Sequence, residues 1–347
     1  MKKIAVEDLV AALRNDVEVP AEVWHELLLS GSRERISALA RDVAVRNFGK
    51  GVFVRALIEI SSYCRNNCNY CGIRCGNGTA VRYRLDKETI LECCRRAASL
   101  GFSTFVLQGG EDPMQNDEWL AGVVSSVKAE FPDKAVTLSV GERSASGYGL
   151  LRSAGADRYL LRHETADELH YSFLHPSSMS AAARRRCLDD LAGFGYQVGS
   201  GMMIGSPGQT TEHLVADLML LDRLRPQMIG MGPFIPAGGT PFENEPAGDA
   251  ELTLHIISLL RLRFPRALIP ATTALATLLP DGTERGVLAG ANVVMPNFTP
   301  LDIRKNYSIY DNKKNNGSES AEQLHLLGEK LEKIGYHIDF SRGDYIP

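Results

Sequence analysis

The chain has 347 residues, of which 44% are hydrophobic and 23% are charged, and these proportions are typical of a soluble globular protein. The net charge of -4 provides no general attraction for nucleic acid, and the run of three arginines at 184–186 is too short to provide one. The composition therefore argues against a disordered chain, a nucleic-acid partner and a membrane partner.

The first 50 residues form a predicted N-terminal helical segment. The stretch "MKKIAVEDLVAALRNDVEVP" carries charges through its first apolar run, which is typical of an amphipathic helix and unlike a secretion signal. Seven cysteines, an odd number, do not suggest a disulfide framework, and a reducing compartment favours metal-binding or free-thiol roles. We expect the protein to stay in the cytoplasm.

Residues 51–300 alternate short β-prone runs with longer helical patterns that often end in glycine. The predicted strands cover residues 54–61, 104–108, 135–140, 157–162, 197–205, 227–232, 267–272 and 291–296. Eight such units predict an α/β fold, a (β/α)8 barrel of the TIM type. The alternative is a doubly wound open sheet. Residues 301–347 form a predicted C-terminal extension packed on the barrel, with a surface loop, "DNKKNNGSES", before an amphipathic helix.

The segments that follow the predicted strands are rich in polar residues and glycine, for example "YCRNNCNYCG", "QGGEDP" and "RHET". In a barrel of this type, the loops after the strands meet at one mouth, which is where the active site lies. The sequence therefore predicts a single site built from several distant segments.

Three cysteines, Cys64, Cys68 and Cys71, follow the first strand with C-x3-C-x2-C spacing. Three thiolates can converge on one metal centre and leave a coordination position open, which is typical of reactive sites. Two alternatives are three free thiols or a structural zinc site with Cys75 as a fourth ligand. No histidine lies near this loop, so we favour an iron-sulfur centre over zinc.

This loop resembles the hallmark motif of the radical S-adenosylmethionine (SAM) enzymes. In this sequence, Tyr70 fills the aromatic or apolar position of the motif, just before the last cysteine. The resemblance implies a 4Fe-4S cluster on the three cysteines, with SAM on its open iron and cleavage of SAM to a 5'-deoxyadenosyl radical. The segment Gln108, Gly109, Gly110 and Glu111 resembles the family's Gly-Gly-Glu motif, which lies against the SAM amino group. Glycine allows such a close backbone approach.

A longer resemblance covers residues 50–310 and points to the HydE family of hydrogenase maturases, through segments such as "RYLLRHETA" and "MPNFTP". It implies that Glu164 holds the SAM ribose and that Arg184 holds the SAM carboxylate. It also implies a substrate cavity lined by Arg162, Thr272, Thr273 and Tyr307.

The same resemblance implies a set of partners. The substrate would be a small or organometallic molecule with a cysteine-like carboxylate. The electron donor would be a ferredoxin or flavodoxin, and other hydrogenase maturases would make transient contacts.

Residue spacing supports Arg184 independently of the resemblance. Arg185 and Arg186 have opposite charges four residues on and so resemble a solvated helix face, whereas Arg184 shares a stripe with Leu188 and Leu191. An arginine that faces inward needs an anion, from the protein or from a ligand.

The substrate residues each have a plain structural alternative. Arg162 and Glu164 stand two apart at a strand end, where the alternative is a structural salt bridge between them or with neighbours. Either threonine, Thr272 or Thr273, could cap the helix that follows. Tyr307 could be an ordinary core tyrosine.

No cysteine follows Cys187, so we expect one cluster and no accessory site. The same absence argues against HydG and biotin synthase, which need further cluster ligands. Two other functions remain open. One is a radical mutase similar to methylornithine synthase, and the other is an iron-sulfur carrier or scaffold without catalysis.

Overall fold

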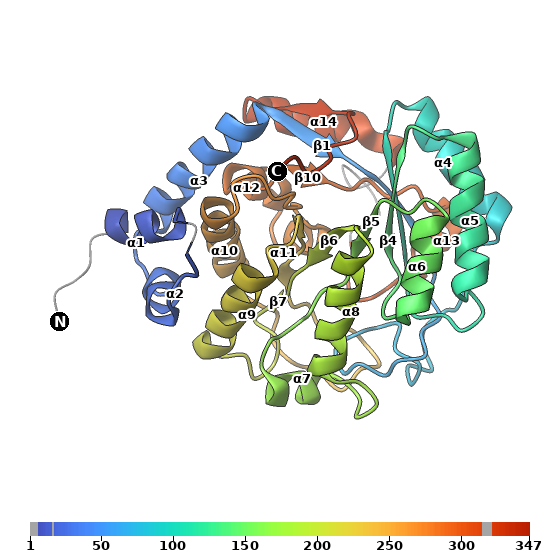
Figure 1. The fold of residues 1–347 in the computed structure, drawn as a ribbon, viewed down its shortest axis with the longest axis horizontal. Coiled ribbons are helices and arrows are strands. Elements are labelled where there is room, and N and C mark those ends of the chain that lie inside the picture. The colour runs from blue at the N-terminus through green and yellow to red at the C-terminus, as the bar shows by residue number, and fades with distance from the viewer. Residues whose placement is uncertain (1–5, 16, 314–320) are drawn as a thin grey trace.

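Parallel strands form the centre of the protein, and helices surround them (Figure 1). The computed structural model describes residues 6–15, 17–313 and 321–347. The strands are β1 (Gly51–Val54), β2 (Ala56–Ser61), β3 (Thr104–Gly109), β4 (Ala135–Ser139), β5 (Arg158–Leu160), β6 (Gln197–Ser200), β7 (Met203–Ile204), β8 (Met228–Ile229), β9 (Gly232–Pro233), β10 (Val293–Val294) and β11 (His337–Asp339).

These strands close into a barrel. Strands β2, β3, β4, β5, β6 and β8 pair in that order, and every pair is parallel. Met228 bridges Leu268, Pro270 bridges Val293, and β10 pairs with β1, which continues into β2 after Arg55. Residues 267–272 thus supply the seventh strand through isolated bridges. The predicted (β/α)8 barrel is confirmed, and the open sheet was wrong.

The helices begin where short polar side chains satisfy their first amides. Asp86, Asn116, Ser144 and Ser180 each accept a hydrogen bond from the amide three residues on. The helices of the barrel are α4 (Lys87–Ser99), α5 (Asp117–Glu130), α6 (Ala145–Ser153), α7 (Glu168–Leu174), α8 (Ala181–Gly193), α9 (Thr211–Leu224), α10 (Ala250–Arg263), α11 (Thr273–Leu278), α12 (Gly282–Leu288) and α13 (Leu301–Arg304).

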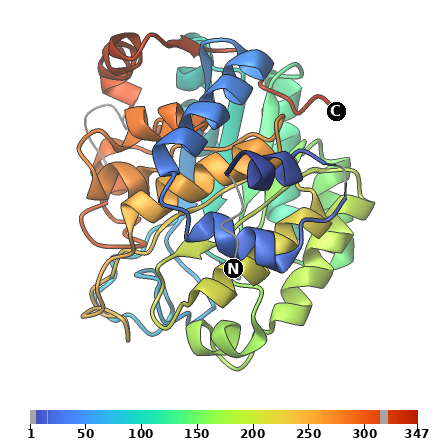
Figure 2. The same ribbon diagram turned by 90° about the vertical axis from the view of Figure 1, so that its left-hand side faces the viewer.

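The predicted N-terminal helices are also present, as α1 (Val6–Leu13), α2 (Ala21–Leu28) and α3 (Arg33–Phe48). They lie across the outside of the barrel, where α3 packs on α10 (Figure 2). None of the helices in the described part of the chain is long and apolar enough to cross a membrane.

The core lies between the strands and the helices because side chains alternate along each strand. On β2, Ala56, Ile58 and Ile60 are fully buried in this core. Arg55 and Glu59 alternate with them and so point into the barrel. Complete burial of one such isoleucine contributes about 1.5–3 kcal/mol.

The chain ends at the base of the barrel. After η2 (Ala321–Gln323) and α14 (Leu324–Lys333), strand β11 pairs with β1, and the sequence did not predict this strand. The predicted amphipathic helix is confirmed as α14, while residues 314–320 of the predicted surface loop lie outside the described residues. The boundaries at 50 and 300 stay a prediction.

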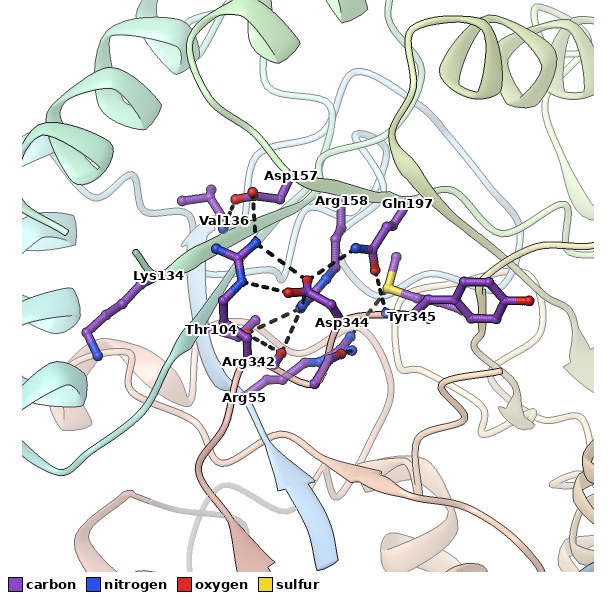
Figure 3. Close-up of polar contacts among 12 residues, drawn as sticks. Arg55, Thr104, Lys134, Val136, Asp157, Arg158, Gln197, Arg342, Asp344 and Tyr345 are labelled. Atoms are coloured by element: carbon purple, nitrogen blue, oxygen red, sulfur yellow. Dashed lines mark hydrogen bonds and ion pairs between the residues drawn. The ribbon is translucent and has the colours of Figure 1, made fainter. Parts of the chain in front are cut away.

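The final residues fill the base (Figure 3). The guanidinium of Arg158, which has no exposed surface, donates to Asp344 at 2.6 Å and to the carbonyl of Arg342 at 2.8 Å. Gln197 binds both Asp344 and the amide of Tyr345. The C-terminal segment therefore closes the end of the barrel opposite the loops that follow the strands.

Candidate active site at the mouth of the barrel

The cysteine loop begins directly after β2, at the mouth. Cys64, Cys68 and Cys71 are partly buried, whereas Cys75 is exposed, and all four thiols are free. Burial and the neighbouring cysteines raise the pKa of Cys68, and burial with the proximity of Cys64 raises the pKa of Cys71 to about 12. The thiols predicted to act together therefore lie close enough to affect one another.

The arrangement of the possible metal ligands can be compared with the needs of a single metal ion and of a cluster. Among the described residues, no three Cys, His, Asp or Glu side chains are arranged to hold one metal ion. A 4Fe-4S cluster makes a different demand, because each thiolate ligates its own iron.

Arg82 holds the cysteine loop in shape, a role that the sequence analysis missed. Its guanidinium donates to the carbonyls of Ser62, Ile73 and Arg74 at 2.6–2.7 Å. From the opposite side, the amide of Gly72 donates to the carbonyl of Ile309 at 2.9 Å. The loop therefore has a fixed conformation that depends on residues far along the chain.

The Gly-Gly-Glu segment lies against this loop, at the end of β3. A Cβ atom on Gly110 would stand 2.2 Å from the carbonyl oxygen of Tyr63 and 2.7 Å from the Cβ of Cys64. Only glycine fits such an approach. The carboxylate of Glu111 accepts from Arg65 at 3.0 Å and from the amide of Glu142 at 2.8 Å, and Gln108 pairs in register with Glu59 and Ser139.

Glu164 lies beyond the end of β5 in an unusual backbone conformation. Its φ is 65°, which costs a residue other than glycine about 1–3 kcal/mol. The Arg162 Nε donates to its Oε1 at 3.0 Å, so the salt bridge that the sequence left open as a structural alternative is present. Its Oε2 is buried and has no hydrogen-bond partner among the described residues. A buried carboxylate oxygen without a donor is unfavourable by about 1–3 kcal/mol, so this oxygen suits a ligand hydroxyl.

Arg184 on α8 is buried, as its position in the apolar stripe predicts. Its Nε donates to Glu142 at 2.6 Å and its Nη1 to the carbonyl of Arg162 at 2.7 Å. The anion that it meets therefore comes from Glu142, which the sequence analysis did not single out. Arg185 pairs with Glu168 at 2.7 Å instead of the acid four residues on.

Three further residues of this site were also missed, and all come from the α7 region. Tyr70 shares a hydrogen bond of 3.1 Å with His175, and Tyr171 stacks on His175 with ring centroids 3.9 Å apart. Burial lowers the pKa of His175 to about 3, so its ring is neutral at pH 7. Met179 lies 4.0 Å from the Cys68 sulfur. The density of aromatic and histidine residues in "HYSFLHPSSM" was the available signal.

The predicted substrate residues lie at separate points around the mouth. Thr272 follows the seventh strand and Thr273 begins α11, three strands around the barrel from Arg162. Thr272 stands at the N-cap position of α11, yet its side chain makes no capping hydrogen bond. Tyr307 is buried, and burial raises its pKa, as do the nearby Glu59 and Cys71.

A groove of about 590 Å³ runs along the outer rim beside this site. Its walls include Glu111, Glu142 and Cys187. Cys187 is partly buried and contributes to this groove.

Comparison with known proteins gives three kinds of match. Residues 58–221 match the model of the Radical SAM superfamily. The chain is 44% identical over 299 residues to the [FeFe] hydrogenase maturase subunit HydE of Thermotoga maritima, with 85% of each chain covered. It is 31% identical over 318 residues to 3-methylornithine synthase of Methanosarcina acetivorans, with 88% of this chain and 89% of the relative covered.

A solved structure supports the same fold. The crystal structure of methylornithine synthase (PylB) matches with a TM-score of 0.82 and 29% identity. The match covers 95% of this chain and 97% of that one.

Proposed function

Because this chain belongs to the radical SAM superfamily of enzymes, and within it to the family of the maturase HydE, we propose that it acts in assembly of the [FeFe] hydrogenase active-site cluster. The observation that carries the proposal is the grouping of a three-cysteine loop, a glycine-rich strand end and a carboxylate with an unpartnered oxygen at one barrel mouth.

The cofactors of this enzyme are a 4Fe-4S cluster and SAM. When bound, they supply reductive cleavage of SAM to methionine and a 5'-deoxyadenosyl radical. We assign Cys64, Cys68 and Cys71 as the cluster ligands. The fit rests on the donor set, which is three partly buried free thiols in one loop, whereas the fourth, Cys75, is exposed.

The chain's own residues would bind and orient SAM. The unpartnered Oε2 of Glu164 accepts from a ribose hydroxyl, while Arg162 fixes the other oxygen. Arg184 would meet the SAM carboxylate with the part of its guanidinium that neither Glu142 nor the carbonyl of Arg162 uses. Tyr70 and the segment 108–111 complete the wall, and Gly110 permits close backbone approach.

We propose that the substrate is a small or organometallic molecule with a cysteine-like carboxylate. Arg162, Thr272, Thr273 and Tyr307 would hold it, because a guanidinium and hydroxyls can fix a carboxylate's orientation. We further propose a cytoplasmic setting, with a ferredoxin or flavodoxin as electron donor and transient contact with other maturases.

A second candidate function is a 3-methylornithine synthase, which the solved structure favours at 29% identity and a TM-score of 0.82. An iron-sulfur carrier without catalysis would not need the arginine and carboxylate arrangement around Glu164.

The test uses anaerobically reconstituted full-length protein. SAM should change the electron paramagnetic resonance spectrum of the reduced cluster, and dithionite should then drive formation of 5'-deoxyadenosine. Hydrogenase maturation with the other maturases should require this chain, and lysine should not yield methylornithine. Methylornithine production would establish the second function, and a spectrum indifferent to SAM would establish a carrier.

A further inference from the structure

The cysteine loop has a charge opposite to that of the whole protein. Residues 61–85 contain Arg65, Arg74, Arg82 and Arg84 and no aspartate or glutamate, although the chain's net charge is -4. This segment covers the predicted cluster ligands. The positive charge of segment 61–85 is therefore concentrated around the proposed cluster, where electrons must enter.

Part of this segment forms a rigid exposed platform. The guanidinium of Arg84 lies 3.5 Å from the ring centre of Tyr63 and binds Asp112 through two hydrogen bonds of 2.6 and 3.0 Å. Asp112 is buried and also accepts from Ser61 and from the amide of Met114. This network ties Tyr63, Arg84 and Met114 together beside Cys64.

The platform has apolar as well as basic parts. Met114 and Val81 are 70% and 59% exposed. Val81 adjoins Tyr63 because its carbonyl accepts from Ser62. Basic and apolar groups in one exposed region are typical of a surface that binds another protein.

Two platform arginines have acidic partners, but those acids are buried while the guanidiniums reach solvent. The side chains of Arg65 and Arg84 are 61% and 34% exposed, and those of Glu111 and Asp112 are 7% and 0% exposed. Glu111 pairs with Arg65 and Asp112 with Arg84, while in the adjoining groove Asp117 pairs with Arg143 and Glu142 with Arg184. Arg74 instead donates to the amide oxygen of Asn67, and Arg82 donates to backbone carbonyls. Within the described residues, neither arginine has a carboxylate partner. Arg74 and Arg82 therefore add positive charge that no ion pair within these residues offsets.

We propose that the surface formed by Tyr63, Arg65, Arg74, Val81, Arg84 and Met114 is the docking site of an acidic one-electron carrier protein. This inference rests on the proposed function, since only a redox cluster on Cys64 needs such a donor. Tyr63 and Arg65 are the chain neighbours of Cys64. A protein bound to this surface would therefore lie one residue away from a proposed cluster ligand. One electron leaves the donor, which is oxidised, and enters the cluster, which is reduced, with no proton or atom transferred.

Two substitutions test the surface without touching its arginines. Val81→Glu and Met114→Glu place negative charge on exposed side chains that bind neither cofactor nor substrate. Leu100→Glu, at the 43% exposed C-cap of α4 near the barrel base, is the matched control. The holoenzyme is mixed with reduced acidic ferredoxin, and the cluster's absorbance bleaching is followed by stopped flow at several ionic strengths.

Each platform variant should slow reduction by ferredoxin about three- to tenfold at low salt, because like charge opposes association. The difference should shrink as salt shortens the screening length from about 10 Å at 0.1 M to about 3 Å at 1 M. Reduction by dithionite, SAM affinity and the thermal midpoint should match the parent. The same measurements on Leu100→Glu should show no change.

Equal ferredoxin rates in all variants and the parent would overturn the docking site while leaving the proposed function intact. Absence of dithionite-driven 5'-deoxyadenosine in the parent would instead overturn the proposed function. An equal slowing by Leu100→Glu would show a whole-protein charge effect and would also overturn the site.

Discussion

The two ends of the barrel both bury arginines, but they satisfy them differently. At the base, Arg158 forms an ion pair with Asp344, which lies in the last residues of the chain. At the mouth, Arg162 and Arg184 pair with Glu164 and Glu142, which follow neighbouring strands. The C-terminal segment covers the base, whereas loops that still leave a carboxylate oxygen unpartnered surround the mouth.

This difference separates stability from function within one scaffold. At the base, the carboxylate of Asp344 pairs with a buried arginine of the same protein, so its removal should affect folding. The free oxygen of Glu164 is matched to a ligand, so its removal should affect binding. The base also leaves the Nε atoms of Arg55 and Arg158 without partners among the described residues.

The largest effect is expected at the mouth, from the cysteines. Changing Cys64, Cys68 or Cys71 to serine should abolish the cluster, because each would ligate a different iron. Iron content and the absorbance spectrum after anaerobic reconstitution measure this. Cys75→Ser is the control and should retain the cluster, and its loss in that variant would refute the ligand assignment.

At the base, Asp344→Ala should lower the free energy of unfolding by about 2–4 kcal/mol. Loss of one partner leaves a buried charge uncompensated, although the one-third exposed side chain of Asp344 moderates the effect. Chemical denaturation measures it, with the exposed Asp302→Ala as control. SAM affinity should not change. A stability equal to that of the parent would mean that the C-terminal segment does not hold the base closed.

The same pair predicts an acid-sensitive range. Burial alone would raise the pKa of Asp344, but hydrogen bonds from Arg342 and Arg158 outweigh it and lower the pKa to about 2. Its folded value lies below the unfolded value of about 3.9, so the stabilisation is complete above that value and is lost as the pH falls towards 2. Asp344→Asn should remove this part of the acid transition in a pH series of denaturation curves.

Glu164→Gln should leave the cluster intact and weaken SAM binding by about 1–3 kcal/mol, the range for a hydrogen bond to a charged or buried group. Arg184→Ala should act in the same direction. Titration of the reconstituted protein with SAM measures both. Glu168→Gln on α7, where the side chain is mostly exposed, is the matched control. If both site variants bind SAM as tightly as the parent protein, SAM does not bind at this position.

The smallest effect concerns substrate rather than cofactor. Arg162→Lys keeps the charge but loses the planar fork, so it should reduce maturation while SAM cleavage without substrate continues. Activation of hydrogenase and formation of 5'-deoxyadenosine are measured side by side. Arg162 also holds the Oε1 of Glu164, so equal loss of both would limit its role to that positioning or to the fold. Full maturation would remove it from the substrate site.

Local patterns carried most of the fold prediction. Strands, helices and their order depend on alternation, capping and glycine stops that lie within a few residues, and the eight predicted strand positions fall on the barrel. Cysteine spacing and the glycine pair are local as well. They predicted which loops carry the site before any contact between them was known.

The sequence by itself therefore determined the barrel, the cysteine loop and the inward face of Arg184. Tertiary structure alone decided that Glu142 neutralises Arg184, that Tyr171 and His175 back Tyr70, and that the C-terminal segment seals the base. Arg158 and Asp344 are 186 residues apart in the chain. The sequence pattern does not predict such pairs, because the periodicity of a strand or helix indicates only which face a side chain lies on. The partner across that face depends on how the whole barrel closes.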